Sequence, residues 1–193
     1  MEIFMLTAVG VTVSVALMIN KKREPLHISF AALCLAISFH KGGIFFNPFF
    51  HSGAWLLVER LGFLAIPPLT IKFSRDFCEE QTLLKKRDIR TTALFSAGLA
   101  AILFTPVAGW KYLGPFIYLY GETVLLLSYL SLIAFAKRRA TGVEKKRIVY
   151  LIIACTAAIA TYSIPPLFNL VVAGMLYFIL IMITHPHLTE LHD

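Results

Sequence analysis

Residues 166–184 read PLFNLVVAGMLYFILIMIT, and none of them is charged. An α-helix needs about 20 mostly apolar residues to cross the hydrocarbon core of a bilayer, because its backbone amides must all be paired within the segment. This stretch therefore predicts a membrane-spanning helix. The whole chain agrees, since 58% of its residues are hydrophobic, 15% are charged and the mean hydropathy is +0.76. Such a composition excludes an ordinary soluble domain.

Six further apolar segments precede this one, so we expect an all-α, polytopic bundle of seven transmembrane helices. Two of the segments are less regular than the others, because residues 40–43 interrupt the second and because the sixth is short. The expected spans are residues 3–19, 28–46, 54–71, 92–109, 113–136, 148–162 and 166–184. Residues 1–184 then form one transmembrane domain, and residues 185–193 begin a cytoplasmic signalling helix or tail.

Most of the 18 lysine and arginine residues lie in the connections that follow the first, third and fifth segments. Short loops rich in lysine and arginine stay in the cytoplasm, so the N-terminus is expected outside and the C-terminus inside. The net charge of +7 is then a topology signal that also attracts anionic lipid headgroups. We expect a multi-pass protein of the inner (cytoplasmic) membrane, with membrane lipid and not nucleic acid as its partner.

Ionisable residues are rare inside these apolar segments. Each costs about 2.5–3.5 kcal/mol near the middle of a span, so such residues are usually paired or functional. They gather in the half of the segments that is expected to face outward, which predicts an outward-opening polar pocket. Its expected members are Glu122, Arg60, Glu59, Lys41, His40 and Tyr118.

Glu122 and Arg60 are expected to form an ion pair in this pocket. At a rise of about 1.5 Å per residue, the two lie at similar depths in the fifth and third segments. Three interpretations remain open. The pair is a structural bridge that fixes helix register, part of a ligand-binding or proton-sensing site, or part of a transport pathway.

Two adjacent prolines, Pro67 and Pro68, lie inside the third segment. Proline removes a backbone donor and clashes with the preceding helical turn, so a kink is expected there. That kink serves either as a fixed bend or as a moving hinge.

Motifs for catalysis are absent from the sequence, which contains no HExxH, no GxSxG and no GxxxxGK pattern. His185, His187 and His192 follow the last span without cysteines or carboxylates at metal-ligand spacing. We therefore expect no catalytic residue, no metal site and no cofactor in this chain.

Three stretches resemble the seven-helix N-terminal sensor module of bacterial and archaeal histidine kinases, which also precedes some cyclic-dinucleotide enzymes. They are residues 61–73 with their proline pair, residues 114–129 followed by the basic groups 137–139 and 145–147, and residues 177–191. Histidines and Pro186 stand where that family has a basic, aromatic junction. The resemblance implies a homodimeric sensor that passes a signal through its last helix to a cytoplasmic output domain or partner protein.

The leading hypothesis is therefore a sensory membrane domain that detects a small or lipophilic ligand or a change in the membrane. A second hypothesis is a small transporter or channel component that uses Glu122 as an intramembrane carboxylate. A third is a membrane scaffold without a ligand, in which Glu122 and Arg60 together could be replaced by apolar residues.

Overall fold

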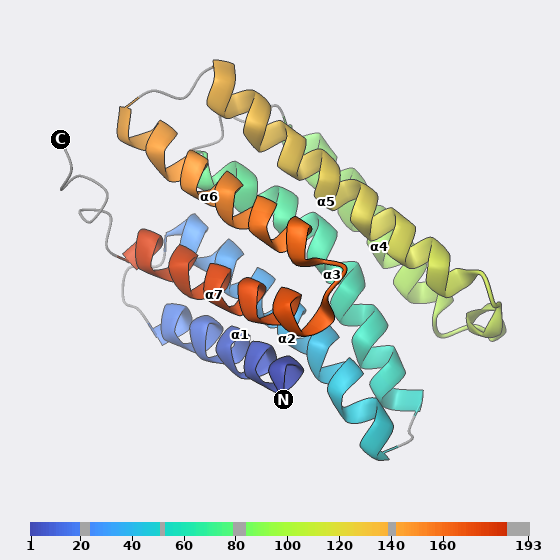
Figure 1. Ribbon diagram of the computed structural model, residues 1–193. Helices are drawn as coiled ribbons and strands as arrows, with labels where there is room; N and C mark the ends of the chain where they lie inside the picture. The colour runs from blue at the N-terminus through green and yellow to red at the C-terminus, as the bar shows by residue number, and fades with distance from the viewer. Residues whose placement is uncertain (20–23, 51–52, 79–83, 139–141, 185–193) are drawn as a thin grey trace.

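The computed structural model describes residues 1–19, 24–50, 53–78, 84–138 and 142–184, and over these residues it is helical with no strand (Figure 1). The predicted all-α fold is thus confirmed, whereas the predicted signalling helix or tail at residues 185–193 lies outside the described residues. The α-helices are α1 (Glu2–Ile19), α2 (Pro25–Phe50), α3 (Gly53–Phe77), α4 (Lys86–Ile102), α5 (Leu113–Arg138), α6 (Gly142–Thr161) and α7 (Pro165–Thr184).

The helices pack in a closed circuit with one helix outside it. α1 packs against α2, α2 against α3, α3 against α5, α5 against α6, α6 against α7, and α7 against α1. α4 packs against α3 from outside this circuit, beside α5 (Figure 1). The Tyr120 hydroxyl of α5 donates to the Thr92 carbonyl of α4 at 3.0 Å, which ties the outer helix to the bundle.

Five helices, α1, α2, α3, α5 and α7, are long and apolar enough to cross a membrane, so the chain is a polytopic membrane protein. α4 has 17 residues, and α6 carries Lys145, Lys146 and Arg147 near its start. All seven expected helices are present, but α4 and α6 do not meet the requirement of length and apolar composition for crossing a membrane.

Several predicted boundaries are wrong, most clearly those of α2 and α4. α2 continues through Gly42 and Gly43 to Phe50, so the residues expected to interrupt the second span lie inside the helix. α4 begins at Lys86, earlier than expected, because the Asp88 carboxylate accepts a hydrogen bond of 2.7 Å from the Lys85 backbone amide and caps the first turn. α4 also ends at Ile102, and a separate 3-10 turn (Pro106–Gly109) follows.

Glycines make the contact between α2 and α3 unusually close. A Cβ atom added at Gly43 would lie 2.5 Å from the backbone nitrogen of Glu59 and 2.6 Å from its Cα. A Cβ added at Gly62 would overlap the backbone of His40. Since lipid supplies no hydrophobic drive for helix association, close backbone packing of this kind is what holds such helices together.

The neighbouring contacts of this pair follow the same rule. Gly10 of α1 lies against Ser38 of α2, whose hydroxyl donates to the Thr7 carbonyl of α1 at 3.2 Å. Gly121 of α5 leaves room for the ring of Phe63 on α3. Glycine therefore sets the approach of α1 and α3 to α2, and of α5 to α3.

Pro67 and Pro68 lie within α3, and the helix continues beyond them to Phe77. Pro67 is fully buried. The sequence placed the pair inside the third segment correctly, and a role as a hinge stays a prediction.

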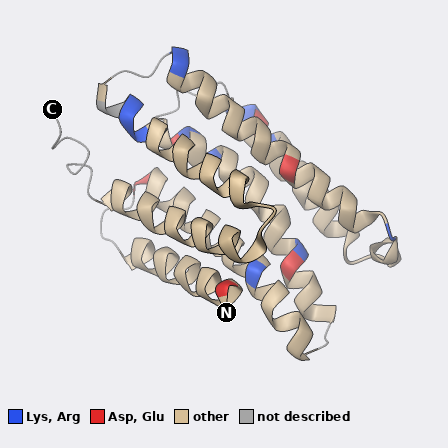
Figure 2. Cartoon of the chain, viewed as in Figure 1, with Lys and Arg blue, Asp and Glu red and all other residues tan. Residues whose placement is uncertain are grey.

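Basic residues gather at one end of the bundle, where α5 ends, α6 begins and α4 begins (Figure 2). Few acidic or basic residues lie along the rest of the described helices, and most of these lie in the opposite half of the bundle. The orientation with the N-terminus outside stays a prediction.

Substitution at the α2–α3 contact should destabilise the protein. Gly43→Ala places a methyl group against the Glu59 backbone, which cannot move aside as a flexible side chain would. We expect the free energy of unfolding to fall by about 1–3 kcal/mol, measured by thermal unfolding in lipid nanodiscs. Gly98→Ala on α4 is the matched control, because no atom lies within 4 Å of its added Cβ. Equal unfolding temperatures for the two variants would contradict the close contact.

The orientation can be tested by cysteine labelling in intact cells. Lys111→Cys, in the connection between α4 and α5, should react with a membrane-impermeant maleimide. Lys137→Cys, at the end of α5, should react only after the membrane is permeabilised. The opposite pattern would reverse the predicted topology.

Candidate functional site

Three of the predicted site residues meet where α2, α3 and α5 come together. The Tyr118 hydroxyl of α5 donates a hydrogen bond of 2.5 Å to the Glu59 carboxylate of α3. The ring nitrogen Nδ1 of His40 on α2 lies 3.2 Å from the backbone carbonyl oxygen of Glu59. Because a carbonyl only accepts, His40 Nδ1 carries the hydrogen, and when the ring is neutral Nε2 is then an acceptor.

The glycine contacts explain why these side chains meet. Gly43 lies on the backbone of Glu59, and Gly62 lies on the backbone of His40, so the two polar residues are held at the closest point between α2 and α3. Phe63, one residue after Gly62, fills the space next to them. Its ring centroid lies 5.1 Å from that of His40 and 4.6 Å from that of Tyr118. One apolar ring therefore lies against both hydrogen-bonded side chains.

Lys41 connects this cluster to α7. Its side chain is partly buried, and its Nζ lies 5.3 Å from the ring centroid of Phe168. A cation over an aromatic face gains up to about 2 kcal/mol where water is excluded. The charge of Glu59 also acts on Lys41, but no ion pair joins them among the described residues.

The predicted ion pair between Glu122 and Arg60 is not formed. The Glu122 carboxylate instead accepts a hydrogen bond of 2.7 Å from the hydroxyl of Tyr162, which follows α6. The Arg60 guanidinium lies near the start of α5, where its Nη2 is 3.8 Å from the position of a Cβ added at Gly114. Gly114 precedes Glu122 by about 12 Å along the helix, so Arg60 sits at a different depth from the carboxylate.

Glu122 is linked to the cluster indirectly. It lies one helical turn after Tyr118 on α5, and its partner Tyr162 packs edge-on against Phe168 with centroids 5.5 Å apart. Phe168 in turn lies under Lys41. Polar and aromatic contacts thus join α2, α3, α5, α7 and the turn after α6. We call the residues that make these contacts the polar cluster. Its members are His40, Lys41, Glu59, Phe63, Tyr118, Glu122, Tyr162 and Phe168.

The sequence missed three of these residues. Phe63 has the ordinary look of a core aromatic, although its position beside Gly62 hints at a close contact. Tyr162 and Phe168 lie on either side of the start of α7 at Pro165, and their spacing gives no sign that they face Glu122 and Lys41.

Within the described residues, no group of three or more His, Cys, Asp or Glu side chains is placed to hold a metal ion. The chemistry that the cluster offers is hydrogen bonding and charge. Glu59 and Glu122 each accept from a tyrosine hydroxyl, while Lys41 and Arg60 each lack an ion pair among the described residues. Such an arrangement can recognise a polar group within the apolar bundle.

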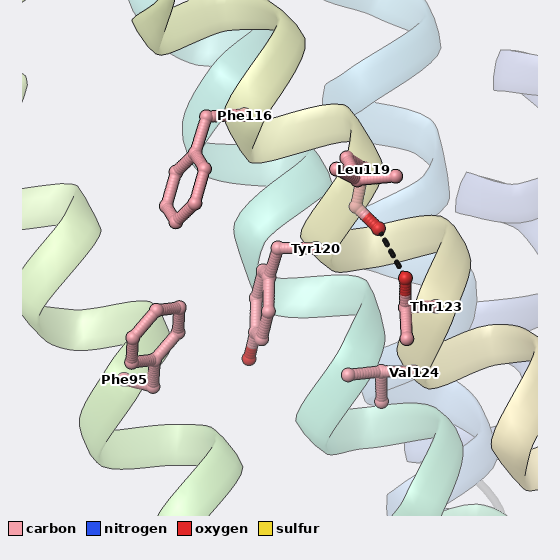
Figure 3. A pocket seen from close by; sticks show the side chains of 6 residues that line it. All are labelled: Phe95, Phe116, Leu119, Tyr120, Thr123 and Val124. Carbon is pink, nitrogen blue, oxygen red and sulfur yellow. Dashed lines mark hydrogen bonds between the residues drawn. The ribbon is translucent and has the colours of Figure 1, made fainter.

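A separate groove of about 240 Å³ lies between α4 and α5 (Figure 3). Its polar atoms are already satisfied, since Tyr120 bonds to α4 and the Thr123 hydroxyl donates to the Leu119 carbonyl at 2.7 Å. The lining residues are Phe95, Phe116, Leu119, Tyr120, Thr123 and Val124, and none belongs to the polar cluster. The groove is open and apolar, as expected of a surface that faces acyl chains.

Comparison of the chain with protein families, with curated proteins and with solved structures finds no match. The likeness to the histidine-kinase sensor module therefore stays a prediction from the sequence, and function has to be argued from the polar cluster.

Proposed function

We propose that this chain is a sensory membrane domain in which the polar cluster receives the stimulus. The observation that carries the proposal is the meeting of His40, Glu59 and Tyr118 between three helices, with Lys41 reaching a fourth. Ionisable groups are costly inside the membrane, and the few that occur there usually serve a function.

A stimulus would act by changing which partners these groups have. A ligand or proton that competes for the Glu59 carboxylate would release the Tyr118 hydroxyl and loosen α3 from α5. The change would reach α7 through Lys41 and Phe168, which connect the cluster to that helix. Such a switch requires that the stimulus favour one helix arrangement over the other.

The last helix would carry the change to a cytoplasmic output domain or partner protein, with two copies of the chain acting together in the inner (cytoplasmic) membrane. The many basic residues at the end where α5 ends and α6 begins suit contact with anionic headgroups on the cytoplasmic side (Figure 2).

A small transporter or channel component is the second candidate. Glu122 favours it, because this carboxylate is exposed on a spanning helix and has a single described hydrogen bond, from Tyr162. Intramembrane carboxylates of this kind carry protons or bind cations in many transporters.

Loss of the Tyr118 hydroxyl should loosen α7 at a distance. Tyr118→Phe removes the hydrogen bond to Glu59 and should lower the local opening free energy of residues 176–184 by about 1 kcal/mol. Hydrogen exchange by mass spectrometry in nanodiscs measures this opening. Tyr112→Phe is the matched control, since Tyr112 is exposed before α5 and its described ring contacts are with its neighbours Trp110 and Lys111. Unchanged exchange in Tyr118→Phe would remove the proposed route to α7.

A flux assay separates the two candidate functions. Proteoliposomes containing a pH-sensitive dye and the wild-type chain should show the same proton and potassium leak as empty liposomes. A leak that rises with protein content and disappears in Glu122→Gln would favour the transporter instead.

A further inference from the structure

Lys41 has hydrogen-bonding capacity that the described residues do not use. Its ammonium group carries three N–H donors, yet its described contact is the face of the Phe168 ring. Glu59 acts on it from beyond ion-pairing distance, and the Glu59 carboxylate already accepts the Tyr118 hydroxyl. A partly buried cation is stabilised best by an anion that also accepts its hydrogen bonds.

His40, the preceding residue, has a second unused group. Its side chain is 7% exposed, and Nδ1 is occupied by the Glu59 carbonyl oxygen. Nε2 has no hydrogen-bond partner among the described residues, and it is not one of the fully buried polar atoms, so part of its surface is accessible to a ligand. Consecutive residues of α2 therefore offer a cation and an accessible ring nitrogen, and neither has a hydrogen-bond partner among the described residues.

Other ligand chemistries fit this place less well. A metal cation would be repelled by Lys41, and within the described residues no group of three or more His, Cys, Asp or Glu side chains is placed to hold one. A wholly apolar ligand would leave the Lys41 donors and His40 Nε2 without partners. The groove between α4 and α5 suits such an apolar molecule, and it lies apart from Lys41.

We propose that the polar cluster binds an anion carrying a carboxylate or phosphate group, with Lys41 as its main contact. An oxygen of the anion accepts hydrogen bonds from the Lys41 ammonium, and a protonated oxygen or a hydroxyl group on the same molecule donates to His40 Nε2. The inference rests on the proposed sensory function, for which it names the class of ligand. The anion is either a small molecule in solution or the headgroup of an anionic lipid.

Thermal unfolding of the whole chain in phosphatidylcholine nanodiscs tests this inference. Acetate and inorganic phosphate are titrated at constant ionic strength with potassium chloride, because salts also stabilise proteins non-specifically. The wild type should show a saturable rise in its unfolding temperature with at least one of the two anions. Lys41→Met should need at least tenfold more anion for half the rise, whereas Lys41→Arg should keep most of the response.

Lys111→Met is the matched control, because it removes one basic charge from the connection between α4 and α5, outside the polar cluster. It should respond like the wild type. Nanodiscs in which phosphatidylglycerol replaces part of the phosphatidylcholine test the lipid source. A rise there without free anion, lost in Lys41→Met and kept in Lys111→Met, would assign the site to a lipid headgroup.

The inference is overturned if the wild type shows no saturable response to acetate, phosphate or phosphatidylglycerol, and this result needs no variant. It is also overturned if Lys41→Met responds like the wild type; Lys41→Gln replaces that variant in the test if Lys41→Met does not fold. The proposed sensory function is judged separately by the effect of Tyr118→Phe on α7. A failure of anion binding with a positive result there would leave a sensor for another ligand.

Discussion

The structure depends on the close backbone contact between α2 and α3 at Gly43 and Gly62. In lipid, apolar side chains gain nothing by leaving one apolar medium for another, so helices associate through close packing and interhelical hydrogen bonds. A side chain at either glycine would separate the two backbones. That separation would also break the hydrogen bond from His40 to the Glu59 carbonyl oxygen, which spans the same contact. Packing and polar chemistry are thus coupled at one place in the bundle.

The polar cluster forms around this contact between α2 and α3. Once α2 and α3 are close, Phe63 packs into the space that Gly121 leaves on α5, and Tyr118 comes within reach of the Glu59 carboxylate. α7 joins through the cation–π contact of Lys41. The result is a small set of ionisable groups in which the carboxylates have hydroxyl partners and Lys41 has none of its hydrogen bonds filled by described residues. This imbalance gives the site its proposed preference for anions.

Much of the fold was predictable from the sequence, because hydrophobic segments of sufficient length have few alternatives in a membrane. The seven segments and the small set of polar residues were found in this way. Pairing of those residues was not predictable. Their positions in the sequence place Glu122 and Arg60 at similar depths in the membrane, but depth specifies neither the helix face nor the side-chain partner. The Glu122 carboxylate accepts a hydrogen bond from Tyr162 instead. Gly42 and Gly43 suggested a break in α2 by their usual role, whereas in this bundle Gly43 serves helix packing.

The protonation state of the His40 ring tests the central contact most directly. Nitrogen-15 solid-state NMR of the histidine-labelled chain in lipid bilayers, with His40 assigned by comparison with His40→Gln, distinguishes the two neutral tautomers. We expect a neutral ring protonated at Nδ1, since that atom donates to the Glu59 carbonyl oxygen across the α2–α3 contact. A ring protonated only at Nε2 would show that this hydrogen bond is absent and would contradict the proposed geometry of the site.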